Sequence, residues 1–398
     1  MATGFDTGGG PVPDNQGKKT MKEMIPLNAS LIERIRAIHQ DRSFQVRVPV
    51  EKQRIFTPDG SDGAWYYSHH PFITKFKGKL YAVWSSGRIN EDDVGQRVML
   101  ATSENFTDWK VGVLVDSIRG ENTELTLYAT GLYTDGETLT VYYTAYEYTA
   151  DTLRKNPDGS DLRPEEKFCK RVRHSPRYLQ TTDGVHWSIP KPVSGNFTCG
   201  EIYCGNLSPV RLPSGKLFWP GYGSFAISEN GDPTGSWQGR FLPLAEEEEK
   251  TRSITESGVL VHEDGTLFLL SRTDGGTSVC AASADDGKTW TDFYHTQITD
   301  HGAKFEIGRL PDGRYYLLAN ADNRRTSVNL FVSRDGCSFD KWYLLADEDY
   351  RQMKEGMYKG GVYGYPTSCI DDNYLYCIYS LRKESVELLR VDLSEISR

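Results

Sequence analysis

Side chains that can do chemistry recur at one kind of position in this sequence, next to the ends of short apolar runs. Arginine binds carboxylates with two parallel hydrogen bonds, whereas histidine, glutamate, aspartate and tyrosine serve as general acids and bases. A set of this kind, brought together, could bind an anionic molecule and move a proton on or off it. The positions are His69, His70, Arg88, Asp92, Tyr222, Glu256, Arg272, Glu306, Arg324, Arg325, Tyr363 and Tyr365.

The elements that must position these residues are β-hairpins. From Trp65 onward a unit of roughly 45 residues recurs, a period typical of propellers and repeat arrays. Each unit contains an apolar strand, a turn with Gly or Asp, and a second strand. The clearest hairpins are FITKFKGKLYAVWSSGR, TGLYTDGETLTVYYTAYEY, SPVRLPSGKLFWPGYG, GVLVHEDGTLFLLSRTDGG, IGRLPDGRYYLLANADN and TSCIDDNYLYCIYSLR. They predict an all-β chain forming a six-bladed, alternatively seven-bladed, β-propeller of four-stranded antiparallel blades.

Composition and charge narrow the class of protein. The 398 residues include 38 Gly, 23 Tyr and 8 Trp, which favours many short strands joined by tight turns. A formal charge of −9 without a basic stripe argues against nucleic-acid and anionic-membrane partners. The seven cysteines form no C-x-x-C motif, so we expect free thiols. No apolar segment follows Met1, which predicts a cytoplasmic protein.

The amino-terminal region differs from the rest of the sequence in composition and periodicity. Residues 1–24 are rich in Gly, Pro and Lys without periodicity and are interpreted as a flexible leader. Residues 29–39 carry apolar positions at helical spacing after Asn28, which predicts one short helix. We therefore expect a single propeller domain over residues 25–398.

Four predicted third strands end in related motifs: SENFTDW, TTDGVHW, SADDGKTW and SRDGCSF. The third matches S-x-D-x-G-x-T-W fully, with Ser283, Asp285, Gly287, Thr289 and Trp290. This pattern resembles the Asp-box, or BNR repeat, of the sialidase superfamily, which implies a β-propeller. The Asp caps its own turn and the aromatic residue wedges between strands, so the motif is structural. Blade topology places it opposite the face on which first strands begin, where we expect the chemistry-bearing residues to meet.

The resemblance to sialidases also implies residue roles. Sialidases hold the sugar carboxylate with three arginines, and Arg272 resembles the second of these while Arg324 or Arg325 resembles the third. The first is missing, because the segment that opens the first blade reads Ser68-His69-His70-Pro71. A histidine is charged only conditionally, so the carboxylate clamp differs from that of a conventional sialidase.

In sialidases a tyrosine, activated by a glutamate, attacks the sugar, and an aspartate protonates the leaving group. Glu256 resembles the activating glutamate, and Tyr363 or Tyr365 falls near the tyrosine. Asp92 or Asp93 corresponds to the acid. A tyrosine nucleophile suits an anionic substrate, which would repel a carboxylate.

A second resemblance rests on the first blade. The double histidine, Arg88 and the run Glu91-Asp92-Asp93 look similar to propellers that act on rhamnose–glucuronate linkages, a group with glucuronate lyases and an α-L-rhamnosidase. This resemblance implies β-elimination, with His69 or His70 as base or carboxylate partner. Arg272 and Arg324 would neutralise the carboxylate, and Tyr365 would act as the acid.

The preferred function is therefore an exo-acting uronate lyase with an acidic oligosaccharide as its partner. The alternatives are a sialidase-like glycoside hydrolase with a Tyr/Glu pair and a glycan-binding propeller without activity. Plainer interpretations also stand: Glu256 and Glu306 occupy equivalent blade positions and could form salt bridges between blades. No cofactor is required and no catalytic metal is predicted, because no further His or Cys follows His69-His70 at ligand spacing. A structural Ca²⁺ is left open, as is the oligomeric state.

Overall fold

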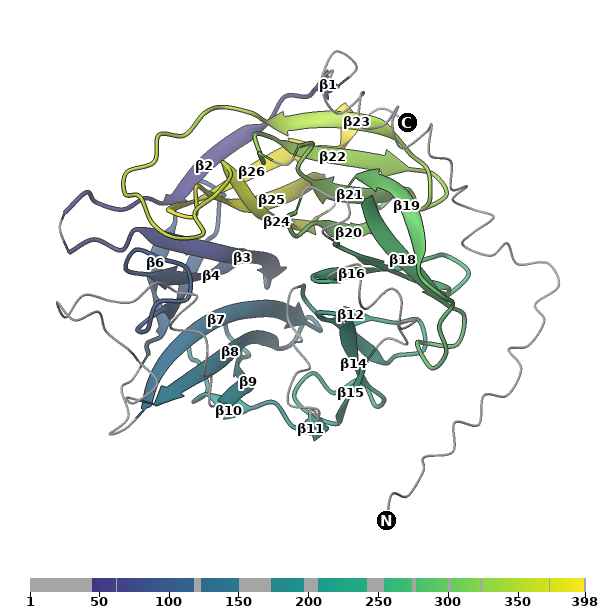
Figure 1. The fold of residues 1–398 in the computed structure, drawn as a ribbon, viewed down its shortest axis with the longest axis horizontal. Helices are drawn as coiled ribbons and strands as arrows, with labels where there is room; N and C mark the ends of the chain where they lie inside the picture. Colours follow the sequence, from purple (N-terminus) through teal and green to yellow (C-terminus); the bar gives the residue numbers. More distant parts are fainter. Residues whose placement is uncertain are drawn as a thin grey trace.

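A computed structural model describes residues 45–61, 63–117, 123–149, 173–196, 207–241, 254–273, 277–299, 302–322, 324–371 and 373–396. Their strands form six sheets arranged as the blades of a propeller around a central axis (Figure 1). The all-β, six-bladed prediction is thereby confirmed. The predicted leader and the helix at residues 29–39 lie outside the described residues. No described helix is long and apolar enough to cross a membrane.

The first three blades follow one another in the sequence. Blade 1 contains β3 (Tyr67–Phe76), β4 (Lys79–Gly87), β5 (Arg97–Ser103) and β6 (Lys110–Val115). Blade 2 contains β7 (Thr123–Thr134), β8 (Leu139–Thr149), β9 (Arg173–Thr181) and β10 (Lys191–Pro192). Blade 3 contains β12 (Val210–Arg211), β13 (Leu217–Pro220), β14 (Ser224–Ser228) and β15 (Trp237–Phe241), with β11 (Gly195–Asn196) added in parallel at its edge.

The other three blades complete the ring. Blade 4 contains β16 (Ser257–Val261), β17 (Leu267–Ser271), β18 (Thr277–Ser283) and β19 (Tyr294–Thr299). Blade 5 contains β20 (Glu306–Arg309), β21 (Tyr315–Ala319), β22 (Val328–Ser333) and β23 (Phe339–Ala346), with β1 (Val46–Arg47) parallel at its edge. Blade 6 contains β24 (Tyr363–Ile370), β25 (Tyr374–Leu381), β26 (Ser385–Asp392) and β2 (Glu51–Phe56). One 3-10 turn, η3 (Leu393–Glu395), follows β26.

Ring closure joins distant parts of the sequence. The early strand β2 pairs antiparallel with β26, so blade 6 is built from both ends of the described chain. Arg54 of β2 donates from Nε and Nη2 to Glu387 Oε2, at 3.0 and 2.8 Å. Ile55 packs in an apolar cluster shared by blades 6 and 1. Closure of this kind leaves fewer free sheet edges than an open array of the same blades.

The core is divided into apolar clusters that each join two neighbouring blades, from blades 1 and 2 round to blades 6 and 1. Alternation along each strand explains this, since residues of both sheet faces pack against an adjacent blade. The innermost strands β3, β7, β12, β16, β20 and β24 surround the axis (Figure 1). Side chains at their starts therefore approach one another.

The full Asp-box lies in the turn after β18 and behaves as predicted. Asp285 Oδ1 accepts hydrogen bonds from the backbone N–H groups of Lys288 and Thr289, at 3.0 and 2.9 Å. Gly287 takes a positive φ of 80°, which the turn requires. Trp290 packs on Phe225 of blade 3, with ring centroids 5.4 Å apart. The motif thus holds its own turn and links blade 4 to blade 3.

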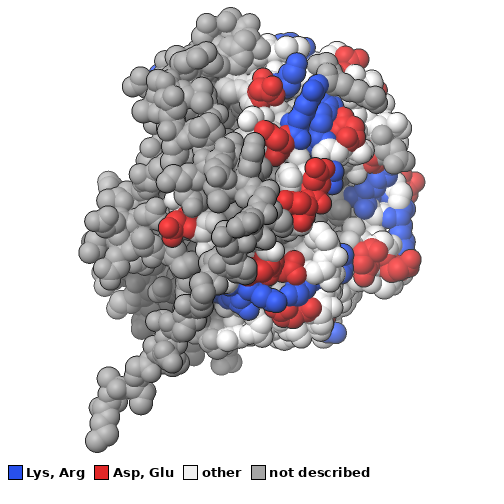
Figure 2. All heavy atoms as spheres, turned by 90° about the vertical axis from the view of Figure 1, so that its right-hand side faces the viewer, with Lys and Arg blue, Asp and Glu red and all other residues white. Residues whose placement is uncertain are grey.

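The described surface carries mixed charge on the side seen in Figure 2. There, Lys and Arg side chains alternate with Asp and Glu side chains over the blades. No single-sign stripe stands out among the described residues of that view.

Candidate active site

The start of β24, the segments flanking β16 and β17, and the loop before β20 meet at the axis. Glu256 lies at their centre with 2% of its surface exposed. Its Oε1 accepts a hydrogen bond from the Tyr365 hydroxyl, and its Oε2 accepts one from Arg272 Nη1 at 2.7 Å. Tyr222, which is 38% exposed, places its hydroxyl 3.4 Å from Oε1. Three blades thus converge on one carboxylate.

Backbone pairing positions Glu256 against Arg272. The ladder between β16 and β17 continues past both strands, because Arg272 N–H donates to the Glu256 carbonyl at 2.8 Å. Residues directly opposite in an antiparallel pair project to the same face of the sheet. The two side chains therefore meet, although Glu256 precedes β16 and Arg272 follows β17 by one residue.

The neighbouring side chains set the protonation state of the Glu256 carboxyl. Burial opposes ionisation of Glu256, but the Arg272 guanidinium and the Tyr365 hydroxyl outweigh it and hold the pKa of the carboxyl below its usual value. Burial and the Glu256 charge raise the pKa of Tyr365 well above that of free tyrosine. The resting pair is consequently a carboxylate that accepts a hydrogen bond from a neutral phenol.

A β-bulge aims Tyr365 at the axis. The pairing of β24 with β25 shifts register between Gly364 and Thr367, and Tyr365 has a positive φ of 53°. Such a conformation is costly for a bulky residue and is retained where the surroundings fix it. Strict alternation would have put Tyr363 and Tyr365 on one side of the strand, and the bulge separates them.

The rings of His69 and His70 both lie near the Tyr365 ring, the first tilted and the second edge-on. His69 is fully buried, its ring lies 4.2 Å from that of Tyr365, and its Nδ1 is 2.7 Å from Ser380 Oγ. His70 sits on a second bulge with φ 54° and is partly exposed, with its ring 5.6 Å from Tyr365. Burial lowers the pKa of both histidines well below the usual value, so both imidazoles are neutral near pH 7.

The loop after β4 brings Glu91 to the histidines. Its Oε2 accepts a hydrogen bond from Lys383 Nζ at 2.6 Å, and its Oε1 accepts one from the Tyr67 hydroxyl at 3.2 Å. His70 Nε2 lies 3.6 Å from the same Oε1. The predicted acid Asp92 follows in this loop, with φ 67°, and its charge contributes to raising the pKa of Tyr67.

Lys304 and Glu306 face the same space from blade 5. Lys304 is 2% exposed, and its ammonium lies over the rings of Phe72 and Tyr365, at 4.3 and 5.3 Å from their centroids. Burial lowers the pKa of Lys304 to about 7. Burial also raises the pKa of Glu306 to about 7, although Ser368 Oγ donates to its Oε2 at 2.9 Å.

Of the two arginines considered for the third position, Arg325 reaches the cluster. Its guanidinium lies 5.9 Å from the Tyr365 ring centroid and donates from Nη2 to the carbonyl of Gly302. The side-chain stem runs against Gly361, where an added Cβ would stand 2.8 Å from Arg325 Cδ. Arg324 is exposed and makes no hydrogen bond or ion pair with the described residues of the cluster.

Two predicted binding residues lie elsewhere. Tyr363 is 1% exposed and packs in the core, where its hydroxyl donates to the Glu348 carbonyl at 2.9 Å, because the bulge turns it away from Tyr365. Arg88 is exposed, lies 5.5 Å from the Trp65 ring centroid and donates to the carbonyl of Gly63. Neither side chain takes part in the cluster around Glu256.

Residues 78–377 match the BNR repeat-like domain, well over half of the sequence. The chain belongs to that family. No curated protein matches the sequence. Among solved structures, a protein of unknown function from Dyadobacter fermentans has a TM-score of 0.61 at 15% identity, covering 86% of this chain and 99% of that one.

Two further solved structures are sialidases of the same fold. The leech intramolecular trans-sialidase, complexed with 2,7-anhydro-Neu5Ac, has a TM-score of 0.61 at 13% identity, covering 87% of this chain and 70% of its own. The Trypanosoma rangeli sialidase, in complex with the inhibitor DANA, has a TM-score of 0.58 at 13% identity, covering 88% of this chain and 60% of its own. At these identities the likeness shows the fold.

Sequence reasoning missed three members of this site, Lys304, Ser380 and Lys383, and it named Glu91 only as part of the run Glu91-Asp92-Asp93, without a role. Lys304 had a usable signal, because it stands two residues before Glu306 and alternation puts both on one side of an extended segment. Glu91 precedes the predicted Asp92 by one residue. Ser380 lies at the end of β25, the second strand of blade 6, and Lys383 follows it, a position the repeat had already marked in other blades.

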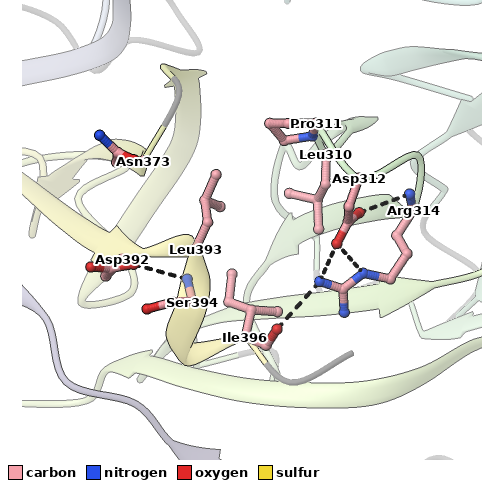
Figure 3. Close-up of a pocket in the computed structure, with 9 residues that line it drawn as sticks. All are labelled: Leu310, Pro311, Asp312, Arg314, Asn373, Asp392, Leu393, Ser394 and Ile396. Atoms are coloured by element: carbon pink, nitrogen blue, oxygen red, sulfur yellow. Dashed lines mark hydrogen bonds and ion pairs between the residues drawn. The ribbon is translucent and has the colours of Figure 1, made fainter.

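A separate cavity of about 510 Å³ lies on the opposite face, where the β20–β21 and β24–β25 turns meet η3 (Figure 3). In it, Arg314 Nε donates to Asp312 Oδ2 at 2.8 Å and Nη2 donates to the Ile396 carbonyl at 3.3 Å. Glu306 and Tyr365 stand at the other ends of β20 and β24. This cavity of the BNR repeat-like propeller is therefore distinct from the Glu256 cluster.

Proposed function

We propose that this protein cleaves the glycosidic bond of a sugar that carries a carboxylate, with Tyr365 as the nucleophile and Glu256 as the base that activates it. The observation that supports this proposal most is the hydrogen bond from the Tyr365 hydroxyl to Glu256. Arg272 on the other carboxylate oxygen keeps Glu256 ionised and ready to accept a proton. This is the arrangement of an activated nucleophile beside its base.

The proposed reaction has two steps, joined by a covalent glycosyl–tyrosine intermediate. The Tyr365 oxygen forms a bond to the anomeric carbon while its proton passes to Glu256 and the bond to the leaving oxygen breaks. The leaving oxygen takes a proton from an acid, for which we propose Asp92 in the loop that also carries Glu91. Water then attacks the anomeric carbon and gives a proton to the Asp92 carboxylate, the bond from that carbon to the Tyr365 oxygen breaks, and Glu256 returns its proton to the phenolate.

The substrate class rests on the cations around Tyr365. Arg272 and Arg325 are partly exposed at the cluster, and the Lys304 ammonium lies over the Tyr365 ring. Cationic groups converging on a site favour an anionic ligand, and guanidinium groups match a carboxylate. A neutral tyrosine also avoids the repulsion that a carboxylate nucleophile would meet. We place sialosides first because the sialidase structures share this fold.

A second candidate is β-elimination at a uronate, which His70 favours. Its imidazole is neutral, partly exposed and 5.6 Å from Tyr365, so it could take the C5 proton while Tyr365 protonates the leaving oxygen. Arg272 would neutralise the carboxylate. The two candidates use the same site and differ in the product they release.

The test is incubation of the full chain with sialyllactose, heparin-type disaccharides and gum-arabic oligosaccharides in parallel. Released sugar is measured together with the ultraviolet absorbance of an unsaturated uronate. We expect a released acid sugar without new absorbance. New absorbance that matches the released sugar would replace hydrolysis with elimination. Saturable binding of an acid sugar without turnover of any substrate would leave a glycan-binding propeller.

A further inference from the structure

We propose that His69, His70 and Glu91 form a binding site for one divalent transition-metal ion, with Zn²⁺ as the best match. One ligand atom from each residue falls within 4.8 Å of the other two. His69 and His70 are adjacent in β3, and Glu91 comes from the loop after β4, so one blade supplies all three. The proposal concerns binding and stands or falls separately from the glycosidase reaction.

The proton on His69 can be assigned from its neighbours. Ser380 Oγ has one hydrogen, and it donates to the Gly364 carbonyl at 3.3 Å. We assign the contact of 2.7 Å between Ser380 Oγ and His69 Nδ1 to donation by the histidine, which is compatible with that bond. In this tautomer the proton of the neutral ring is on Nδ1, and Nε2 carries a lone pair.

That lone pair is buried without a donor. None of the described residues is a hydrogen-bond partner of His69 Nε2, and the whole residue is 0% exposed. A buried polar atom without a partner costs free energy and calls for an explanation. An imidazole whose Nδ1–H donates to a fixed oxygen while Nε2 faces inward is the arrangement of a metal-bound histidine.

The spacing between the other two ligands fits a small ion. His70 Nε2 lies 3.6 Å from Glu91 Oε1. A tetrahedral Zn²⁺ with ligand bonds of about 2.0–2.2 Å sets its ligand atoms about 3.4 Å apart. His70 Nδ1 lies 3.3 Å from Ser85 Oγ, which offers the same outer support that Ser380 gives His69.

Hydrogen bonds from Lys383 and Tyr67 hold the Glu91 carboxylate in place and leave its Oε1 able to bind the ion. Lys383 occupies Oε2, and Tyr67 donates to Oε1 and so orients the carboxylate.

The donor set selects the type of ion. Two imidazoles and one carboxylate suit Zn²⁺ and its neighbours in the first transition row, whereas Ca²⁺ and Mg²⁺ prefer oxygen ligands alone. Three protein ligands leave a fourth tetrahedral position for water or a bound molecule. The site lies beside the Tyr365 ring, which His69 approaches to 4.2 Å.

The test is equilibrium dialysis of the full chain against ZnCl₂ after treatment with a chelator, followed by Co²⁺ substitution and visible absorption. We expect one ion per chain and the absorption bands of a four-coordinate Co²⁺ site. Glu91→Gln and His70→Gln each remove a ligand and should weaken binding more than about 100-fold. Ser380→Ala removes only the support of His69 and should weaken it by about 10-fold to 100-fold.

His186→Gln is the matched control, because His186 is exposed and also has a carboxylate neighbour, Asp183, at 2.7 Å. It should leave binding unchanged. Circular dichroism and thermal unfolding of each variant without metal separate loss of the ligand from loss of the fold. Absence of an ion from the folded wild type at a one-to-one ratio overturns the proposal. Equal binding by folded Glu91→Gln and His70→Gln variants also overturns it.

Discussion

Glu256 remains ionised although it is almost fully buried, because Arg272 and Tyr365 each donate to one of its oxygens. Charge-assisted hydrogen bonds of this kind offset much of the cost of burying a carboxylate. Tyr365 is the member of the set that can be altered with least structural damage, since a phenylalanine keeps its ring contacts with His69 and Lys304.

We therefore predict that Tyr365→Phe lowers kcat/KM by about 10²-fold to 10⁴-fold or more, because the nucleophile is lost while packing stays. Steady-state kinetics on the substrate identified by turnover measures this. Tyr379→Phe is the matched control, as it also removes a buried hydroxyl, which donates to Glu387 at 2.7 Å. Equal activity of wild type and Tyr365→Phe would rule out the tyrosine as nucleophile.

Glu306 makes the stability of the protein depend on pH. Burial raises its pKa from 4.5 to about 7, so its folded form holds a proton that the unfolded chain has lost. The stability from this group is present below pH 4.5 and is lost as pH rises through 7. Across that window wild type should lose up to about 3 kcal/mol relative to Glu306→Gln, which cannot ionise. Urea unfolding of both proteins at several pH values measures the difference, and parallel curves would contradict the pKa shift.

At the scale of the strands, bulges in β3 and β24 turn His70 and Tyr365 toward the axis, and Gly364 leaves room for the neighbouring side chains of His69 and Ser380. A Cβ on Gly364 would stand 2.6 Å from Ser380 Oγ and 2.8 Å from His69 Cε1. The glycine is needed here for close approach of two strands. A side chain at this position would push apart the start of β24 and the histidine on β3.

Gly364→Ala should accordingly destabilise the protein by about 1–3 kcal/mol, as overpacking does in other cores. The variant should also have lower activity, because a displaced His69 would displace the Tyr365 ring that it contacts. Gly360→Ala is the control, since no atom lies within 4 Å of its added Cβ. Chemical denaturation with paired activity measurements tests both, and equal stability of the two variants would show that the strands can separate freely.

At the scale of the molecule, the ring must close for blades 1, 4, 5 and 6 to meet. Closure depends on β2, whose Ile55 packs between blades 6 and 1. Ile55→Ala should cost about 2–4 kcal/mol of unfolding free energy and lower activity near the unfolding midpoint. Val46→Ala, at a residue 57% exposed on β1, should change stability little. Similar losses of unfolding free energy in Ile55→Ala and Val46→Ala would indicate that ring closure depends on something other than the packing of Ile55.

The sequence predicted the architecture better than the site. Hairpin turns and the Asp-box at Ser283–Trp290 repeat with a period, so they identify blades without any knowledge of packing. The contacts of Glu256, Arg272 and Tyr365 follow from blade positions in the same way. Tyr363 and Tyr365 could not be told apart, because the bulge that separates them leaves no fixed pattern in one sequence. Lys304 was missed because a buried lysine runs against the usual preference for exposure.

The most direct test of the account is to trap the sugar on Tyr365. A difluoro analogue of the acid sugar that the protein turns over slows the second step, as in the Trypanosoma rangeli sialidase solved with 2,3-difluorosialic acid as a covalent intermediate. Mass spectrometry of the digested protein should find the sugar mass on the peptide that contains Tyr365, and find none in Tyr365→Phe. Turnover of the natural substrate with the label on another residue, or with no label at all, would contradict the assignment of Tyr365 as nucleophile.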